Sequence, residues 1–363
     1  MFQRLIKRLW PQRYLPESVQ GDPFSESPKP RENGPVGVLL VNLGTPSTPA
    51  PRDIRRYLAE FLSDPRVIEI PRFIWLPILY CFVLTKRPSR LQPRYEGIWM
   101  EGGSPLLVYS RRQTEGVQAA LQARHGGRVC VELAMRYGEP SIAQGITRLR
   151  EQGCERILTV PLYPQYAAST TATVVDAVAK HVAQLRNQPE LRFIKRFHDD
   201  SGYIGALAAQ IAQFWEVNGR PQKLVMSFHG LPRSTVLAGD PYYQDCQETA
   251  QRLAAQLGLA STEFQVTFQS RFGAARWLEP YTEPTLKTLA SQGVAHIDVV
   301  CPGFVADCLE TLEEISEECR DAFLEAGGRQ FRYIPALNDQ PAWTDGLVSL
   351  IDKHLQGWDT HSR

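Results

Sequence analysis

The chain has 363 residues, of which 43% are hydrophobic and 22% are charged, and its formal net charge is +1. This length and composition are those of a globular protein with room for two domains, each with its own core. A charge so close to zero lacks the basic footprint of a nucleic-acid-binding surface, so we expect no nucleic-acid partner. The seven cysteines include no CxxC pair, which favours reduced thiols in the cytoplasm over a disulfide framework.

Residues 1–35 are predicted to form a flexible N-terminal extension. The stretch from Pro16 to Pro35 is rich in Pro, Ser, Glu and Gly, a composition that buries too little apolar surface to fold. Before it, Met1–Trp10 mixes basic and apolar residues in a short amphipathic pattern that suits an anionic membrane surface. No apolar core with a small-residue cleavage site follows, so a secretory signal is not expected.

Beyond the extension, apolar runs typical of strands alternate with segments of helical period. Such alternation predicts parallel sheets covered by helices on both faces. The expected strands are 36–41, 129–135, 157–160, 191–194, 223–228, 264–268, 297–300 and 331–334. They fall into two groups of four, so we predict an α/β fold with two similar doubly wound, Rossmann-like domains, each with a four-stranded parallel sheet, facing across a cleft. The first domain would span residues 36–200 and the second residues 201–357.

The longest apolar run is Phe73–Leu84, which is shorter than the ~20 residues that a membrane-spanning helix needs. Its aromatic and aliphatic residues suit either an ordinary core helix or an interfacial helix. The basic residues Lys86, Arg87 and Arg90 follow it and could pair with lipid phosphates or with carboxylates of a ligand.

His229 stands where the expected strand 223–228 ends. Ligands bind at the carboxyl ends of strands in α/β proteins, and an imidazole titrates near neutrality, so this position suits proton transfer or metal handling. A histidine after an apolar strand is also often a structural hydrogen-bonding residue. The position alone leaves both interpretations open.

Glu310, Glu314 and Glu318 recur every four residues after the expected strand 297–300. On an α-helix they would stack along one face, where each like-charged pair costs about 0.2–0.5 kcal/mol, and no Lys or Arg of the segment shares that face. The row is either a solvated acidic helix or a path for protons or a hydrated divalent cation.

Several motifs, in this order, match one family. They are Leu40–Pro46, Gly102–Leu106, Met135–Tyr137, Tyr163–Tyr166 with Ser169–Thr171, Val225–Pro232 with Gly239–Tyr242, Phe268–Gly273 with Trp277–Leu278, and Cys301–Glu314. With them the chain resembles ferrochelatases, the enzymes that insert Fe²⁺ into a porphyrin. The resemblance runs from about residue 37 to residue 357, and the family's fold agrees with the one predicted above.

The resemblance implies a lyase that inserts Fe²⁺ into protoporphyrin IX, giving protohaem and two released protons in the terminal step of haem biosynthesis. His229 and Glu310 match the family's active-site pair, which implies that they accept protons and guide the metal, with the division of roles open. Glu314 and Glu318 would extend a proton or metal path outward.

Six further residues are expected to bind the porphyrin: Leu43, Arg136, Tyr137, Ser169, Trp277 and Phe304. A guanidinium at Arg136 could take a propionate bidentately, whereas Tyr137 could equally be a core residue. Leu43 cannot ligate a metal, which counts against a metal site on its wall.

By the same resemblance, residues 73–84 form an apolar lip over the active site that faces the membrane. We therefore expect a cytoplasmic protein with peripheral contact to the inner membrane face. Fe²⁺ is expected as a substrate, with no tightly bound cofactor. Animal relatives carry an iron–sulfur cluster on a C-terminal extension, and because no cysteine follows Cys319, no cluster is expected. The alternatives are a coproporphyrin ferrochelatase, a cobalt or nickel tetrapyrrole chelatase and, as a non-enzyme, a haem or metal carrier.

Overall fold

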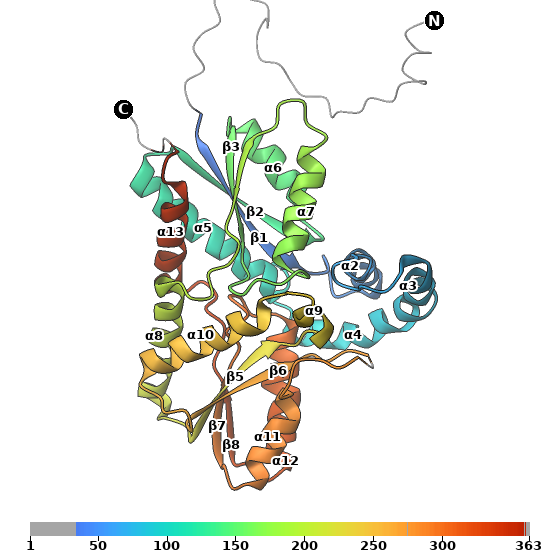
Figure 1. The fold of residues 1–363 in the computed structure, drawn as a ribbon, viewed down its shortest axis with the longest axis vertical. Coiled ribbons are helices and arrows are strands. Elements are labelled where there is room, and N and C mark those ends of the chain that lie inside the picture. Colours follow the sequence, from blue (N-terminus) through green and yellow to red (C-terminus); the bar gives the residue numbers. More distant parts are fainter. Residues whose placement is uncertain (1–33, 274, 359, 361–363) are drawn as a thin grey trace, which may run out of the picture.

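The computed structural model describes residues 34–273, 275–358 and 360. It contains two four-stranded parallel sheets with the strand orders β2-β1-β3-β4 and β6-β5-β7-β8, one above the other in Figure 1. In each sheet the chain runs from the first strand to one edge and then crosses back to build the strands on the other side, as in a doubly wound fold. The predicted α/β fold with two similar sheets is confirmed. Except for residues 34 and 35, the predicted flexible extension lies outside the described residues.

All eight expected strands are present. The first sheet contains β1 (Val36–Gly44), β2 (Val129–Tyr137), β3 (Arg156–Pro161) and β4 (Glu190–Phe193). The second contains β5 (Lys223–His229), β6 (Phe264–Gln269), β7 (His296–Val300) and β8 (Gln330–Tyr333). The inner strands β1 and β5 are apolar almost without interruption because helices cover both faces of their sheets.

Helices connect the strands in both halves. Those of the first half are α2 (Pro51–Leu62), α3 (Arg72–Ile78), η1 (Leu79–Val83), α4 (Leu84–Ile98), α5 (Pro105–His125), α6 (Ile142–Glu151) and α7 (Thr171–Val182). Those of the second half are α8 (Ser201–Asn218), α9 (Arg233–Leu237), α10 (Tyr242–Leu257), α11 (Thr282–Ser291), η2 (Glu310–Cys319), α12 (Arg320–Glu325) and α13 (Pro341–Leu355). The elements η1 and η2 are π-helices, which bond i to i+5.

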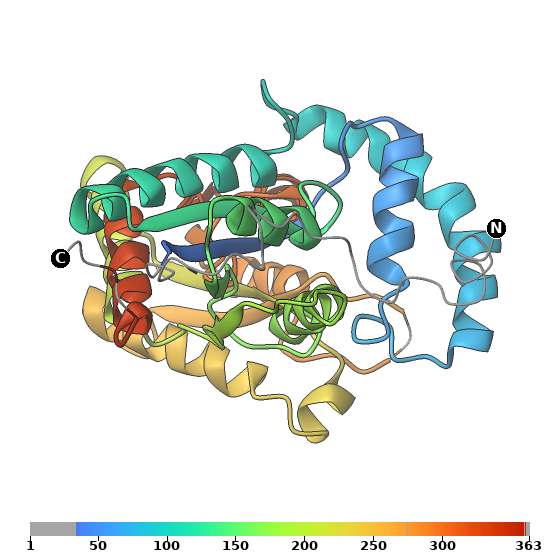
Figure 2. The same cartoon turned by 90° about the horizontal axis from the view of Figure 1, so that it is seen from above.

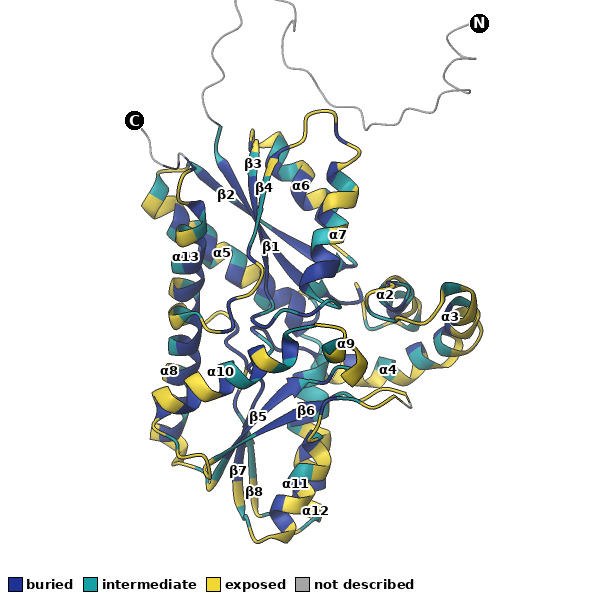
Figure 3. Cartoon of the chain, viewed as in Figure 1, coloured by how far each residue is buried: buried dark blue, intermediate teal, exposed yellow. Residues whose placement is uncertain are grey.

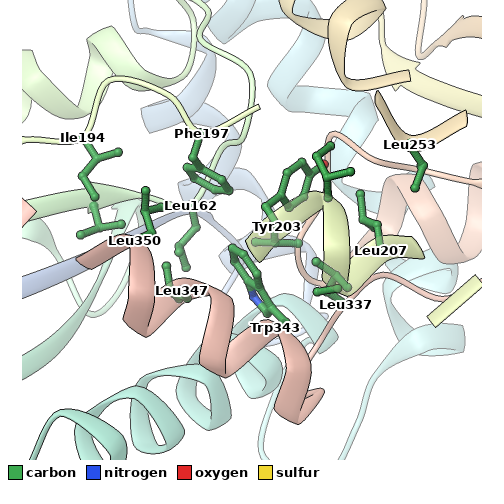
Figure 4. Packing of buried hydrophobic residues seen from close by; sticks show 14 of the residues in the cluster. Leu162, Ile194, Phe197, Tyr203, Leu207, Leu253, Leu337, Trp343, Leu347 and Leu350 are labelled. Atoms are coloured by element: carbon green, nitrogen blue, oxygen red, sulfur yellow. The ribbon is translucent and has the colours of Figure 1, made fainter. Parts of the chain in front are cut away.

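A single apolar core joins the two halves. The C-terminal helix α13 packs on both α8 and α5, so it reaches back to the first sheet (Figure 1). Trp343 of α13 is 1% exposed and stacks on Phe197 with ring centroids 5.8 Å apart, while Tyr203 meets it edge-on at 5.9 Å. Figure 4 shows these rings surrounded by leucines from several elements. The shared core fixes the position of one sheet relative to the other.

The helices α2 to α4 project from one end of the molecule (Figures 1 and 2). Trp75, Leu79 and Leu84 form part of their own small core. On the outside, Phe73 is 81% exposed and Phe82 is 67% exposed, so this end carries apolar side chains in solvent (Figure 3). Residues 73–84 do not form one α-helix. They span α3, η1 and the first residue of α4. In the described part of the chain, no helix is long and apolar enough to cross a membrane.

Candidate active site

His229 is the last residue of β5 and lies half-buried at the carboxyl edge of the second sheet. Its Nδ1 is 2.7 Å from the carbonyl oxygen of Gly230. A carbonyl can only accept, so Nδ1 carries a ring proton, and in the neutral tautomer it is Nε2 that offers a lone pair to a proton or a metal. A Cβ on Gly230 would come within 2.8 Å of the backbone oxygen of Gln269, so only glycine allows the ends of β5 and β6 to approach this closely.

Glu310 begins η2 and is tied to the same sheet edge through Gln269. Gln269 pairs with His229 in the register of β5 and β6. Its Nε2 donates to the backbone oxygen of Glu310 at 2.9 Å, and its Oε1 accepts from Ser227 Oγ at 2.7 Å. One buried amide therefore fixes the helix that carries Glu310 against the two strands beside His229.

Glu314, one turn further along η2, is held by Ser270. The backbone nitrogen of Ser270 donates to Oε1 at 2.7 Å and its hydroxyl donates to Oε2 at 2.5 Å. Ser270 has a φ of 64°, a left-handed conformation that aims both donors at one carboxylate. Burial is the main cause that raises the pKa of Glu314, while His229 lowers it and Glu310 raises it. The predicted residues His229 and Glu310 thus both lie within electrostatic reach of Glu314.

Glu318 does not follow this arrangement. It is exposed, and Arg94 of α4 binds it at 2.8 Å while also binding Glu313 at 2.9 Å. The expectation that no Lys or Arg relieves the acidic row is therefore wrong, because the cation comes from another element. Burial and the nearby Glu318 raise the pKa of Glu313 to about 7, although Arg94 opposes this shift.

Tyr57 of α2 and Tyr95 of α4 approach Glu310 from the projecting helices. Burial raises the pKa of each phenol, and the negative charge of Glu310 adds to the shift, so both hydroxyls stay protonated. Arg87 lies on the same side, where burial lowers its pKa and Glu310 opposes the change. Its guanidinium also stacks over the ring of Phe272 at 5.1 Å. No local sequence pattern marks the two tyrosines, because their position depends on how α2 and α4 fold back.

Three of the predicted porphyrin-binding residues line the meeting point of the two halves. Leu43, at the end of β1, packs in one apolar cluster with Phe304 and Cys308, which follow β7. Trp277 lies with its ring centroid 6.4 Å from that of His229, and its buried Nε1 has no hydrogen-bond partner among the described residues. Trp277 therefore borders His229, while Leu43 and Phe304 form an apolar contact between the two halves.

The other three predicted residues have different surroundings. Arg136 binds Asp64 at 2.5 Å and donates from Nε to the backbone oxygen of Thr173 at 2.8 Å. Tyr137 is 1% exposed and donates to the same Asp64 carboxylate at 3.0 Å. Ser169 is half-buried in the turn before α7. Arg136 and Tyr137 therefore already have internal partners, and the binding of porphyrin by these three residues stays a prediction.

The family model described as Ferrochelatase matches residues 35–355. A ferrochelatase of Bordetella pertussis (strain Tohama I) is 68% identical over 360 residues and covers 99% of both chains. The chain belongs to the ferrochelatase family. A further ferrochelatase, from Azoarcus sp. (strain BH72), is 56% identical over 325 residues, covering 90% of this chain and 89% of the relative.

Solved structures similar to this ferrochelatase-family chain share its fold. SirB from Bacillus subtilis with Fe³⁺ superposes with a TM-score of 0.53 at 15% identity, covering 88% of this chain and 95% of that one. The sirohydrochlorin chelatase SirB from Bacillus subtilis subspecies spizizenii, in complex with cobalt, gives 0.50 at 13% identity, covering 88% and 94%. At such identities the likeness concerns the arrangement of the sheets alone.

A second group of metal-ligand side chains lies away from this ferrochelatase-family site. His198, Asp199 and Glu248 place one ligand atom each within 4.8 Å of one another. His198 Nε2 is 3.0 Å from Glu248 Oε2, and Arg252 binds the other oxygen of Glu248 at 2.6 Å. The arginine and the imidazole already bind the Glu248 carboxylate. We therefore interpret the group as an ion-pair network that joins the segment before α8 to α10.

Two surface hollows also lie elsewhere. One of about 340 Å³ is lined by residues 65 and 68–72, and one of about 530 Å³ lies at the ends of β1 and β2 beside Arg111 and Arg148. Neither contains His229 or Glu310. Leu309, next to Glu310, packs against the core of α2 to α4, and α4 also contacts η2, so the projecting helices meet the helix that carries Glu310.

Proposed function

We propose that His229 and Glu310 together receive the two pyrrole protons of the porphyrin while Fe²⁺ enters the ring. The observation that supports this most is that Gln269 links the two residues. Its side chain binds the backbone of Glu310, and its backbone pairs with His229 at the end of β5. An imidazole and a carboxylate at one apolar edge are groups that can take protons near neutral pH.

The reaction follows from the family. A ferrochelatase inserts ferrous iron into protoporphyrin IX, giving protohaem in the terminal step of haem biosynthesis, and this chain is an enzyme of that family. Fe²⁺ is consumed as a substrate. Porphyrin nitrogens are hidden from the metal in a flat ring, so binding that bends the macrocycle would lower the barrier to insertion. Trp277, Leu43 and Phe304 are the apolar side chains that we assign to this grip.

The metal and the protons need a route between the site and solvent. We assign it to η2, in which Glu314 lies within electrostatic reach of both His229 and Glu310, and Glu318 lies at the surface beside Arg94. The raised pKa of Glu314 supports this role, because a carboxyl that holds its proton to higher pH can accept and release protons closer to neutrality. Either His229 or Glu310 could contact the iron first: imidazole suits Fe²⁺, and carboxylates suit hydrated divalent cations.

Arg136, Tyr137 and Ser169 complete the proposed porphyrin site. A propionate would have to compete with Asp64 for Arg136. Asp64→Asn removes the negative charge that competes for the guanidinium, so propionate binding through Arg136 predicts a lower KM for this variant. A scaffold role for the Arg136–Asp64 pair predicts a loss of stability instead, and thermal unfolding measured beside KM distinguishes the two.

The exposed apolar residues of α3 and η1 support peripheral contact with a membrane. Phe73 of α3 and Phe82 of η1 stand in solvent on the projecting helices. A hydrophobic macrocycle can pass from lipid to the site across such a surface. The protein would then act in the cytoplasm at the inner membrane face, without a resident iron–sulfur cluster.

Anaerobic incubation of the purified protein with Fe²⁺ and excess protoporphyrin IX tests the proposal. Loss of the free-porphyrin spectrum over many equivalents is the expected result, whereas a haem or metal carrier would stop at one equivalent. Parallel reactions with coproporphyrin and sirohydrochlorin, and with Co²⁺ and Ni²⁺, test the alternative chelatases. Faster turnover of either tetrapyrrole than of protoporphyrin would overturn the substrate assignment.

A further inference from the structure

Arg94 connects the projecting helices to the helix that carries Glu310. Its Nη1 is 2.9 Å from Glu313 Oε2 and its Nη2 is 2.8 Å from Glu318 Oε1. The side chain of Glu313 is 13% exposed and that of Glu318 is 50% exposed, so the arginine, itself 44% exposed, reaches from the surface into a half-buried contact. One guanidinium thus holds two carboxylates through its two terminal nitrogens.

The two carboxylates are five residues apart, and that spacing depends on how the helix is wound. In an α-helix of 3.6 residues per turn, residues five apart are about 140° apart around the axis, too far round for one guanidinium to bridge. In a π-helix, backbone bonds run from i to i+5, so such residues lie close to one above the other. The contact with both Glu313 and Glu318 is therefore one that the π form of η2 can make and the α form cannot.

We propose that Arg94 is a positioning residue that holds η2 in its π-helical winding. A contact shifts an equilibrium between two forms only by the difference in its strength between them, and the forked bridge exists in one form alone. The same winding turns Glu310 toward Tyr57, Tyr95 and Cys308 and keeps Glu314 on Ser270. Loss of the bridge would let η2 rewind and move both carboxylates relative to His229.

The effect on catalysis rests on the proposed roles of Glu310 and Glu314, whereas the effect on winding does not. The first experiment is therefore hydrogen exchange of the backbone amides, followed by mass spectrometry of peptides covering residues 309–320. At pH 8, where Glu313 is mostly ionised, we expect Arg94→Ala to speed exchange there about three- to tenfold and to leave the α6 peptide unchanged, since it removes two partly exposed ion pairs.

Arg112→Ala is the matched control. Arg112 is 49% exposed and binds Asp339 at 3.4 Å, so it also joins the two halves through an exposed pair but does not touch η2. It should leave exchange in η2 at the wild-type rate. Arg94→Lys keeps the charge but has one nitrogen in place of the two that reach Glu313 and Glu318 separately, so its exchange should lie between those of wild type and Arg94→Ala.

A second test isolates the bridge. In a Glu313→Gln and Glu318→Gln background, Arg94→Ala should add no further increase in exchange, because the partners are already neutral. In the otherwise wild-type enzyme, Arg94→Ala should lower kcat about three- to tenfold with little change in KM for porphyrin.

The proposal would be overturned if the backbone amides of η2 exchanged at the wild-type rate in Arg94→Ala or in Arg94→Lys. A raised kcat with unchanged exchange would also overturn it, because Arg94 would then be a latch that slows opening of α2 to α4. If the wild-type protein turned over no porphyrin at all, the exchange results would still decide the winding.

Discussion

Ser270 donates two hydrogen bonds, from its backbone nitrogen at 2.7 Å and from its hydroxyl at 2.5 Å, to the carboxylate of Glu314. The pair joins the end of β6 to the middle of η2 and holds a carboxylate within electrostatic reach of His229. Both donors favour the ionised form, so Ser270 limits how far burial raises the pKa of Glu314.

Ser270→Gly tests this link, because glycine keeps the backbone donor and tolerates a φ of 64° but lacks the hydroxyl. The pKa of Glu314 should rise, since one charge-assisted hydrogen bond is lost. We expect the acid limb of the pH profile of kcat/KM to move to higher pH and kcat at pH 7 to fall about tenfold. Ser270→Ala should give the same profile with a lower stability than Ser270→Gly. An unchanged acid limb in both variants would exclude Glu314 from the proton path.

Glu313 should give the protein a pH-dependent stability. Its pKa is about 7 in the folded chain and about 4.3 when unfolded. Between these values the folded state holds an extra proton, so this contribution to stability is full below about pH 4.3 and is lost as the pH rises through about 7. Glu313→Gln removes the titration, so its Tm relative to wild type should increase steadily from pH 5 to pH 8. A difference in Tm that is constant over this range would contradict the prediction.

Membrane contact through α3 and η1 predicts that Phe73→Ser and Phe82→Ser weaken binding to vesicles containing phosphatidylglycerol several-fold, because each removes exposed apolar surface. Both side chains are largely in solvent, at 81% and 67%, so the Tm should stay close to that of wild type. Val217→Ser is the control, since Val217 of α8 is 82% exposed on another part of the molecule. Equal co-sedimentation of all three variants with vesicles would argue against this surface.

The sheets were predictable because their signal is local. Inner strands such as β1 and β5 are buried on both faces and read as apolar runs, so even the place of His229 at a strand end could be found. Parallel order then brought the end of β5 and the loop after β7 to one edge.

The winding of η2 could not be found in the same way. Its i to i+4 glutamates match an α-helix, and the π form depends on partners such as Arg94 that come from a distant helix. The left-handed Ser270 and the approach of Tyr57 to Glu310 likewise depend on tertiary packing, which overrides local preference.

The most direct test of the central claim compares wild type with His229→Ala and Glu310→Gln, measuring porphyrin binding by fluorescence and Fe²⁺ insertion under anaerobic conditions. We expect each variant to lose at least about 100-fold in kcat, since a proton acceptor is removed, and to bind porphyrin with nearly the wild-type Kd. Weakened porphyrin binding with unchanged turnover of the bound porphyrin would contradict the account, because the two residues would then hold the substrate and not carry out the proton transfer.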